Sequence, residues 1–499
     1  MAGRQVVRRN PLHRLVRDAG RPDRAAGGLE RYRREIAGDE EGNERVSYDL
    51  ILKNGEIVFP GEGVARGSVA VKGGKIAAIL QPGETAEATR VIDCTDRWIL
   101  PGAIDPHTHV GFGAKEDDWT TETRTAAMQG VTGLMTFWRS EDLDKTTPEW
   151  RDAGEARSVI DFGFHFGVTA RRHVEDFPKL AAKYGVTSLK VYLMYKGETG
   201  RAKGFTEVDD ALLFQALQAA ATVKGGVVGV HCENTEVIPV FREPVKASGR
   251  MDLGAWDDQS PGFLETENVF RVAYFGEKAG CPVNIVHMSA GESLDLVRKM
   301  RRPDRPAINV ETCIHYLALT RDSDIGDLGK VNPPLRSQSD ADTLWEGVRD
   351  GAVQTIGSDH VARKRATKGP DIWQASAGFP GLAQIWPVLV SEGFHKRGIP
   401  IETLSAATSR NVAKLYNLSG KGRIAPGYDA DFAIVDPDGE TTVRHTDYPS
   451  HSDYSPYEGM TFRGAVTHTV LRGMLLSENG ALAEGVDAAP AGKYLFRAN

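Results

Sequence analysis

Histidines recur along this sequence at positions where a metal ion could bind them. His107 and His109 stand one residue apart, directly after an apolar run and the turn Pro101-Gly102. On an extended strand, side chains at i and i+2 point to the same side, so both imidazoles could reach one metal ion from the end of one strand. The pair alone is a weak signal. Its interpretation depends on whether further ligands follow at the ends of later strands.

Further residues of ligand type do lie at the ends of later apolar segments. His231 ends the segment 227–231, His287 ends 283–287, and Asp359 follows 353–356. A single histidine at a strand end is more often a hydrogen-bonding group than a ligand, but repeated coincidences of this kind are improbable. Four histidines and one aspartate suit two borderline metal ions such as zinc. Lys190 lies within another segment, where an unpaired ammonium is strongly disfavoured and cannot bind a cation.

These residues belong to a regular alternation of apolar segments and helix-like stretches between residues 102 and 418. Helix-like runs such as 210–223 and 266–278 separate most of the apolar segments. The alternation predicts an α/β fold, a (β/α)₈ TIM barrel, whose C-terminal mouth would collect the ligand residues. The eight predicted strands are 103–107, 133–137, 163–168, 188–193, 227–231, 283–287, 307–310 and 353–356.

Short β segments flank the predicted barrel on both sides. From Tyr48 onward, Asn54-Gly55 and Gly73-Gly74 predict two hairpin turns. Late β-like segments at 427–435 and 465–471 should rejoin these hairpins, so that the N- and C-terminal segments form a small β-sandwich domain. The predicted division is a flexible Arg-rich N-terminal extension at 1–46, sandwich at 47–102, metal-dependent hydrolase barrel at 103–420, sandwich again at 421–480, and a C-terminal tail at 481–499.

Composition excludes several classes of partner. The 499 residues carry a formal net charge of −7, which gives no reason to expect nucleic acid or an anionic membrane surface as partner. No stretch of about 18 apolar residues predicts a transmembrane helix, and the N-terminus lacks the apolar core of a secretory signal. The four cysteines are widely spaced, which suits a reduced, cytoplasmic protein without a disulfide framework.

Six short motifs make the sequence resemble a known family. The sequence resembles the cyclic amidohydrolases, and most closely the dihydropyrimidinase and D-hydantoinase group, from about residue 48 to the late 470s. The resemblance implies an enzyme that hydrolyses a C–N bond in a cyclic amide or ureide, opening a hydantoin or dihydropyrimidine ring, and that forms a homo-oligomer, a tetramer or a dimer. The motifs are Asp105-Pro106-His107-Thr108-His109, the segment 189–196, His231-Cys232-Glu233-Asn234, Glu311-Thr312-Cys313, the segment 331–336, and Gly357-Ser358-Asp359-His360.

The resemblance also implies a role for each candidate site residue. His107, His109 and Asp359 would hold one metal ion, and His231 and His287 a second. Lys190, carboxylated to N6-carboxylysine, would bridge the two ions together with the attacking hydroxide. Asp359 would act as general base and then acid, and Tyr195 would donate a hydrogen bond to the oxyanion. Backbone groups of Ser289 and Asn332 would bind the substrate ring.

Other histidines are expected to be structural or to support ligands, with His360, beside Asp359, best placed for support. They are His165, His173, His315 and His360.

Departures from the family pattern leave the substrate open. His315, the Val361-Ala362-Arg363 stretch and the glycine-rich loop after His109 differ from the usual residues around the substrate. Allantoinase, or another cyclic imide or amide hydrolase of the same superfamily, is therefore an alternative. Dihydroorotase is disfavoured, because its carboxylate-binding arginine would fall at Gly111. A non-catalytic, dihydropyrimidinase-like scaffold is disfavoured because all six ligand positions are filled.

Overall fold

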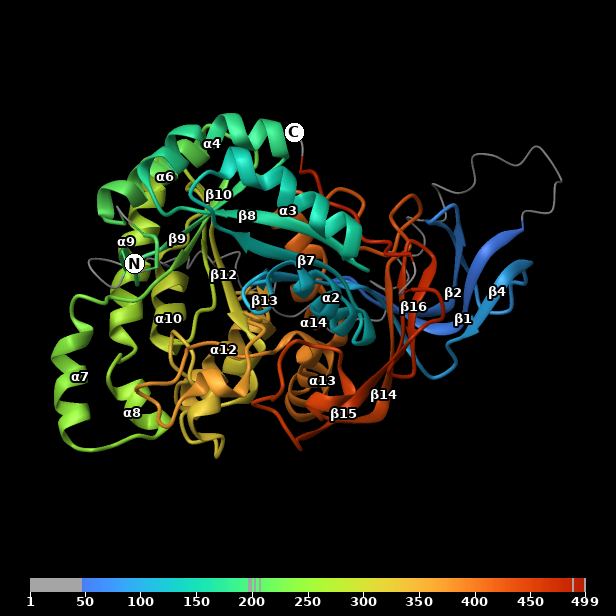
Figure 1. Ribbon diagram of the computed structural model, residues 1–499. Coiled ribbons are helices and arrows are strands. Elements are labelled where there is room, and N and C mark those ends of the chain that lie inside the picture. The colour runs from blue at the N-terminus through green and yellow to red at the C-terminus, as the bar shows by residue number, and fades with distance from the viewer. Residues whose placement is uncertain (1–46, 196–199, 202, 206–207, 487–488, 498–499) are drawn as a thin grey trace, which may run out of the picture.

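Two sheets organise the chain in this computed structural model, which describes residues 47–195, 200–201, 203–205, 208–486 and 489–497. One is an eight-stranded parallel sheet, and the other is a nine-stranded sheet that contains strands from both ends of the chain. Figure 1 shows the second sheet on one side of the barrel, far from helices α7 (Ile238–Ala247) and α8 (Leu253–Asp258). The predicted N-terminal extension, residues 1–46, lies outside the described residues.

The parallel sheet forms a nearly closed barrel, as the sequence predicted. Its strands follow one another in chain order, and the first and last meet where Thr108 bridges His360 and the His109 N–H donates to the His360 carbonyl at 2.9 Å. Each predicted strand overlaps an observed one. The strands are β6 (Ala103–Thr108), β7 (Val131–Trp138), β8 (Asp161–Gly167), β9 (Ser188–Tyr192), β10 (Val227–His231), β11 (Val283–Ile285), β12 (Ile308–Cys313) and β13 (Thr355–Gly357).

Helices follow most of these strands and surround the barrel (Figure 1). Local capping explains where two of them begin. Asp209 accepts a hydrogen bond from the Leu212 N–H at 2.7 Å at the start of α6, and Ser337 and Asp340 form a capping box at the start of α12. The remaining helices are α2 (Asp118–Met128), α3 (Leu143–Arg157), α4 (Arg171–Tyr184), α6 (Asp210–Ala221), α9 (Phe263–Ala279), α10 (Gly291–Met300), α11 (Ile314–Ala318), α12 (Gln338–Asp350), α13 (Ile385–Val388), α14 (Ile401–Thr408) and α15 (Arg410–Leu415).

The second sheet joins the two flanking segments, which confirms the predicted β domain. Strand β5 lies between β1 and β14, and Ile99 pairs with Ile57 on one side and with Ile434 on the other. The exact boundaries of the predicted domains remain predictions. The strands are β1 (Tyr48–Phe59), β2 (Gly63–Lys72), β3 (Lys75–Leu80), β4 (Ala88–Asp93), β5 (Trp98–Pro101), β14 (Phe432–Thr442), β15 (Thr461–Leu471), β16 (Met474–Glu478) and β17 (Ala481–Leu482).

One of the two predicted hairpin turns is wrong. Gly73-Gly74 does turn the chain between β2 and β3, but Asn54-Gly55 lies inside the continuous strand β1. There the register with β2 slips by one residue, and Asn54 has a left-handed φ of 65°. Asparagine tolerates this conformation in β-bulges as well as in turns, so the local sequence signal was the same for both.

The C-terminal segment packs against the barrel. The Leu495 N–H donates to the Phe162 carbonyl at 2.7 Å, and Tyr494 bridges Phe162. Among the described residues, no helix is long and apolar enough to span a membrane.

A buried ion cluster connects the barrel to the second sheet. Lys421 Nζ lies 2.5 Å from Asp161 of β8, 2.6 Å from Asp431 and 2.9 Å from Asp429. These carboxylates raise the pKa of Lys421 above its usual value, although burial opposes the charged form. The lysine therefore compensates three carboxylates at the junction.

Lys421→Met should destabilise the protein strongly, because it leaves the buried Asp431 carboxylate without a cation among the described residues, whereas Asp161 keeps Arg472 and Asp429 keeps Lys75. We expect the free energy of unfolding to fall by about 3–5 kcal/mol, measured by urea denaturation. Lys75→Met is the matched control: Lys75 also contacts Asp429, at 2.6 Å, but is 52% exposed, and its loss should cost less than about 1 kcal/mol. Equal losses in the two variants would contradict this account.

Candidate active site

A cavity of about 90 Å³ opens at the C-terminal mouth of the barrel. The structure brings eight of the nine predicted site residues to its wall, although they come from the ends of six different strands and the loops that follow them. Ser289 is not among the lining residues. Those that line it are His107, His109, Lys190, Tyr195, His231, His287, Asn332 and Asp359.

Three of these side chains converge on one point. The Nε2 atoms of His107 and His109 lie 3.0 and 3.1 Å from the same Asp359 Oδ1. Burial opposes the ionised carboxylate, but the neighbouring histidines hold the pKa of Asp359 well below its usual value. Burial lowers the pKa of His109 to about 4. A carboxylate and an imidazole with a free lone pair thus face one another in an enclosed space.

His231 and His287 form a second convergent pair. His231 Nδ1 lies 2.8 Å from His287 Nε2, and the His231 Nε2 faces the Glu233 carboxylate at 3.1 Å. Burial lowers the pKa of both histidines, so at least one of the two facing nitrogens presents a lone pair. The His107 and His287 rings are 5.1 Å apart, which makes the two groups neighbours.

Both groups have the chemistry of a divalent-metal site. His107 Nε2 is buried and has no hydrogen-bond partner among the described residues, because its contact with Asp359 lacks hydrogen-bond geometry. Backbone strain also supports a functional site here. His287 and Asp359 have φ of 40° and 49°, a region where non-glycine residues are uncommon. The imidazole and carboxylate donors fit a borderline cation such as zinc.

Lys190 is a buried amine that forms no direct ion pair with the described residues, although Glu311 and Asp359 lie near enough to favour its charged form. It is 1% exposed, and the described residues offer its Nζ no hydrogen bond or ion pair. The Nζ lies 4.6 Å from the centre of the Phe137 ring. Burial lowers the pKa of Lys190 to about 8, so a neutral, nucleophilic amine is accessible near neutral pH.

Two of the three predicted substrate-binding residues line the cavity, and the third does not. Tyr195 and Asn332 line the cavity. Tyr195 is held by the Phe205 ring at 4.6 Å and accepts a hydrogen bond from Lys203 at 3.4 Å. The Ser289 N–H and hydroxyl are instead bound by the Glu265 carboxylate, at 3.2 and 2.5 Å. Only its carbonyl is left for the predicted role.

Known proteins are similar to this chain over nearly its whole length. The amidohydrolase family model matches residues 286–476. The allantoinase of Escherichia coli (strain SE11) is 30% identical over 460 residues, which cover 91% of this chain and 99% of that protein. The chain belongs to the amidohydrolase family. The allantoinase of Salmonella newport (strain SL254) is 31% identical over 465 residues, with the same coverage of 91% and 99%.

Solved structures give the same result for this amidohydrolase. Dihydropyrimidinase from Brevibacillus agri NCHU1002 aligns with a TM-score of 0.80 at 30% identity, covering 90% of this chain and 98% of that one. L-hydantoinase from Arthrobacter aurescens aligns with a TM-score of 0.83 at 28% identity, covering 90% and 99%. The protein is a cyclic amide hydrolase, and membership of the family implies that it binds divalent metal.

Sequence reasoning missed the carboxylates that hold the site histidines. The His107 Nδ1 lies 2.6 Å from Glu311 Oε1, and both side chains are fully buried. Glu233 makes the corresponding contact with His231. Carboxylates of this kind fix the tautomer and orientation of a metal-binding imidazole. Their positions in the quoted motifs, two residues after His231 and directly before Thr312-Cys313, were the available signal.

Three of the four remaining histidines, His165, His173 and His360, have partners away from the cavity, whereas His315 is buried with no hydrogen-bond partner for either ring nitrogen among the described residues. His165 lies between Ser188 Oγ at 2.6 Å and the Pro106 carbonyl at 3.0 Å. His360 faces Glu122 at 2.9 Å and accepts the Gly381 N–H at 3.2 Å, so it fixes the loop after β13. Neither histidine lines the cavity.

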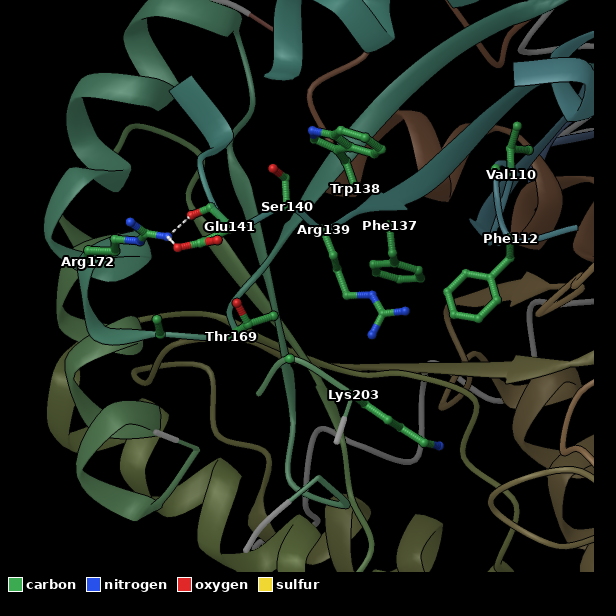
Figure 2. Close-up of a pocket in the computed structure, with 13 residues that line it drawn as sticks. Val110, Phe112, Phe137, Trp138, Arg139, Ser140, Glu141, Thr169, Arg172 and Lys203 are labelled. Atoms are coloured by element: carbon green, nitrogen blue, oxygen red, sulfur yellow. Dashed lines mark hydrogen bonds and ion pairs between the residues drawn. The ribbon is translucent and has the colours of Figure 1, made fainter. Parts of the chain in front are cut away.

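A larger cavity of about 740 Å³ adjoins the first, and the two share Phe112 and Arg139 in their walls. Figure 2 shows Arg139 extending from the end of β7 toward Phe112, while Arg172 lies against Glu141 across the cavity. Arg139 was not among the predicted site residues.

Glu311→Gln should weaken metal binding, because an amide orients and polarises the His107 imidazole less well than a carboxylate. We expect the affinity to fall by roughly 10–100-fold, measured as zinc competition against a chromogenic chelator. Glu265→Gln, which changes an equally buried carboxylate that contacts Ser289, is the control and should keep wild-type affinity. Unchanged affinity in Glu311→Gln would remove Glu311 from the metal centre.

Proposed function

We propose that this amidohydrolase opens the ring of a hydantoin or dihydropyrimidine by hydrolysing a cyclic amide C–N bond at two divalent metal ions. The convergence of two separate donor groups on one cavity, with Lys190 buried beside them, carries the proposal. In this proposal His107, His109 and Asp359 hold one ion, and His231 and His287 the other. Zinc suits these nitrogen and oxygen donors.

Lys190 would join the two ions as N6-carboxylysine. Its uncharged amine would add CO₂ to form a carbamate, an anion with two oxygens, and lose one proton. The supporting observation is that this buried amine forms no direct ion pair with the described residues, and an isolated buried ammonium is costly. Conversion to a bridging anion would remove that cost. When bound, the two ions would supply a nucleophilic hydroxide near neutral pH and polarise the scissile carbonyl.

The protein's own side chains would manage the proton and the oxyanion. Water adds to the ring carbonyl carbon and the C–N bond then breaks, so that the single ring-opened product carries a carboxylate at the former carbonyl carbon and an N–H group at the former ring nitrogen. Asp359 would accept the proton of the attacking water and return it to the leaving nitrogen. Its Oδ1 faces the two histidines, which leaves Oδ2 for the proton. The Tyr195 hydroxyl would donate to the developing oxyanion.

A second ring substrate is also a candidate. Relatives named allantoinase, at 30–31% identity, favour allantoin as a second candidate. A hydrolysis panel of hydantoin, dihydrouracil, allantoin, dihydroorotate and simple cyclic imides with zinc-loaded enzyme separates the two. Fastest turnover of allantoin, which is itself a 5-substituted hydantoin, would assign the second candidate as the substrate, and turnover of none would refute both.

We also propose a cytoplasmic homo-oligomer, a tetramer or a dimer. The four cysteines are all free and buried, which suits a reducing compartment. Exposed apolar side chains on α7 and α9 support self-association; they are Val240, Phe263, Phe270 and Tyr274.

Lys190→Ala should lose both the bridging group and most activity. We expect less than about 1% of wild-type kcat and loss of the carbamate signal in ¹³C NMR spectra recorded with ¹³CO₂. Lys190→Arg keeps a cation but cannot form the same carbamate, so it should be equally inactive. Near-normal turnover in either variant would refute the carbamate.

Tyr195→Phe should lower kcat by about 100-fold, as expected for loss of one oxyanion donor, with little change in KM. Steady-state kinetics on the best ring substrate measures both. Tyr192→Phe is the control, because the Tyr192 hydroxyl is buried and has no hydrogen-bond partner among the described residues. An unchanged kcat in Tyr195→Phe would exclude Tyr195 from the reaction.

A further inference from the structure

Arg139 projects from the end of β7 into the wall shared by the two cavities. Its guanidinium lies 5.0 Å from the centre of the Phe112 ring, 5.4 Å from that of Tyr192 and 5.2 Å from that of Phe205. The stem crosses β8 at Gly167, where an added Cβ would lie 2.3 Å from Arg139 Cγ. The backbone therefore leaves room for this side chain, and three rings hold it in place.

These rings position the charge of Arg139 without neutralising it. The described residues give its guanidinium no carboxylate and no hydrogen-bond acceptor. Cation–π contacts use the face of a ring and leave the planar fork of N–H donors free. Arg172, in the wall of the larger cavity, differs from Arg139, because its guanidinium is paired with the Glu141 carboxylate at 3.3 Å.

Arg363 brings a second guanidinium to the same place from the loop after β13. It lines the smaller cavity and lies 5.9 Å from the centre of the Phe112 ring that Arg139 also contacts. Its Nε is buried without a hydrogen-bond partner among the described residues. Burial lowers the pKa of Arg363, which reflects the cost of keeping this charge away from water.

Few negative charges offset these two arginines. Among the described residues that line either cavity, the carboxylates are Glu141, which is paired with Arg172, and Asp359, which faces His107 and His109. Two like charges at one aromatic ring repel each other, and the cost rises when water is excluded. An anion placed between them would remove both the repulsion and the unused donors.

We propose that Arg139 and Arg363 bind an anionic substituent, a carboxylate, carried by the ring that the enzyme opens. The inference rests on the proposed ring-opening function and names its substrate class. Guanidinium groups match the geometry of a carboxylate, since each can donate two parallel hydrogen bonds. The arginines lie at strand and loop ends beside the donor groups, so the ring would face the donors while its substituent reaches the arginines.

The conformation and surroundings of Gly111 are consistent with binding of the substituent by Arg139 and Arg363. Its φ is 96°, and a Cβ there would lie 2.5 Å from the Trp150 ring. A side chain cannot approach the cavity from this position. Positive charge reaches the substrate from β7 and from the loop after β13 instead.

The test compares two substrates that differ in charge and scarcely in size, hydantoin-5-acetate and hydantoin-5-acetamide. Zinc-loaded wild-type enzyme should show kcat/KM at least about 10-fold higher for the acetate. Arg139→Met and Arg363→Met should each reduce this ratio by about 10-fold, chiefly through KM for the acetate. Because the ratio is taken within one variant, partial loss of folded protein does not affect it. Arg172→Met, which removes a paired arginine, should keep the wild-type ratio.

A binding measurement separates failure of this inference from failure of the proposed function. Cyclopentylacetate and cyclopentylacetamide have no hydrolysable ring bond, and calorimetry should find tighter binding of the acetate to wild type but not to Arg139→Met. Ring opening without any preference for the acetate, unaffected by either arginine, would overturn the inference alone. Absence of ring opening together with selective cyclopentylacetate binding would overturn the proposed function and leave the anion site in place.

Discussion

The contact between Asp359 and the histidines of the first barrel strand is the constraint on which the site depends. His109 and Asp359 are 250 residues apart in the chain, and they meet only because β6 and β13 close the barrel. Asp105 reinforces the closure by accepting hydrogen bonds from the Ser358 N–H at 3.1 Å and from the Ser358 hydroxyl. Burial raises the pKa of Asp105 to about 6, so a costly buried carboxylate is placed where it connects the two strands.

Buried charge in this barrel is arranged in pairs and chains. Glu311 faces His107 and Glu233 faces His231. Glu122 connects His360 to the loop at Ser450, whose hydroxyl lies 2.7 Å from the carboxylate. Each carboxylate compensates a polar group that would otherwise be buried alone. Lys190, Arg139 and Arg363 depart from this rule among the described residues, and all three line the mouth cavity. Buried groups elsewhere also lack partners among the described residues, for example Trp119 Nε1 and Trp386 Nε1. The shared cavity wall is therefore what marks these three cations as candidates for chemistry and binding.

The sequence predicted the barrel and the convergence of its strand ends because both follow from local patterns. Alternating apolar and amphipathic stretches reveal parallel strands, and the C-terminal ends of such strands must meet at one mouth. The ligand-type residues at these ends were therefore predictable by position, although each came from a different part of the chain. Asn54-Gly55 shows the opposite case. Its signal for a positive φ was correct, but a bulge and a turn require the same local conformation, and only the pairing with β2 distinguishes them.

The arginines could not have been predicted in the same way. Arg139 follows an apolar strand, and a basic residue in that place usually reaches solvent. Its inward position depends on the missing side chain at Gly167, on the next strand, and on rings from three other segments. Such packing is set by tertiary structure and leaves no periodic trace. This difference has a physical basis. Strand ends hold the donor groups rigidly, whereas in our proposal the surrounding loops and strand extensions select the charge of the substrate. Two enzymes with the same donor groups can therefore accept rings that differ in their substituents.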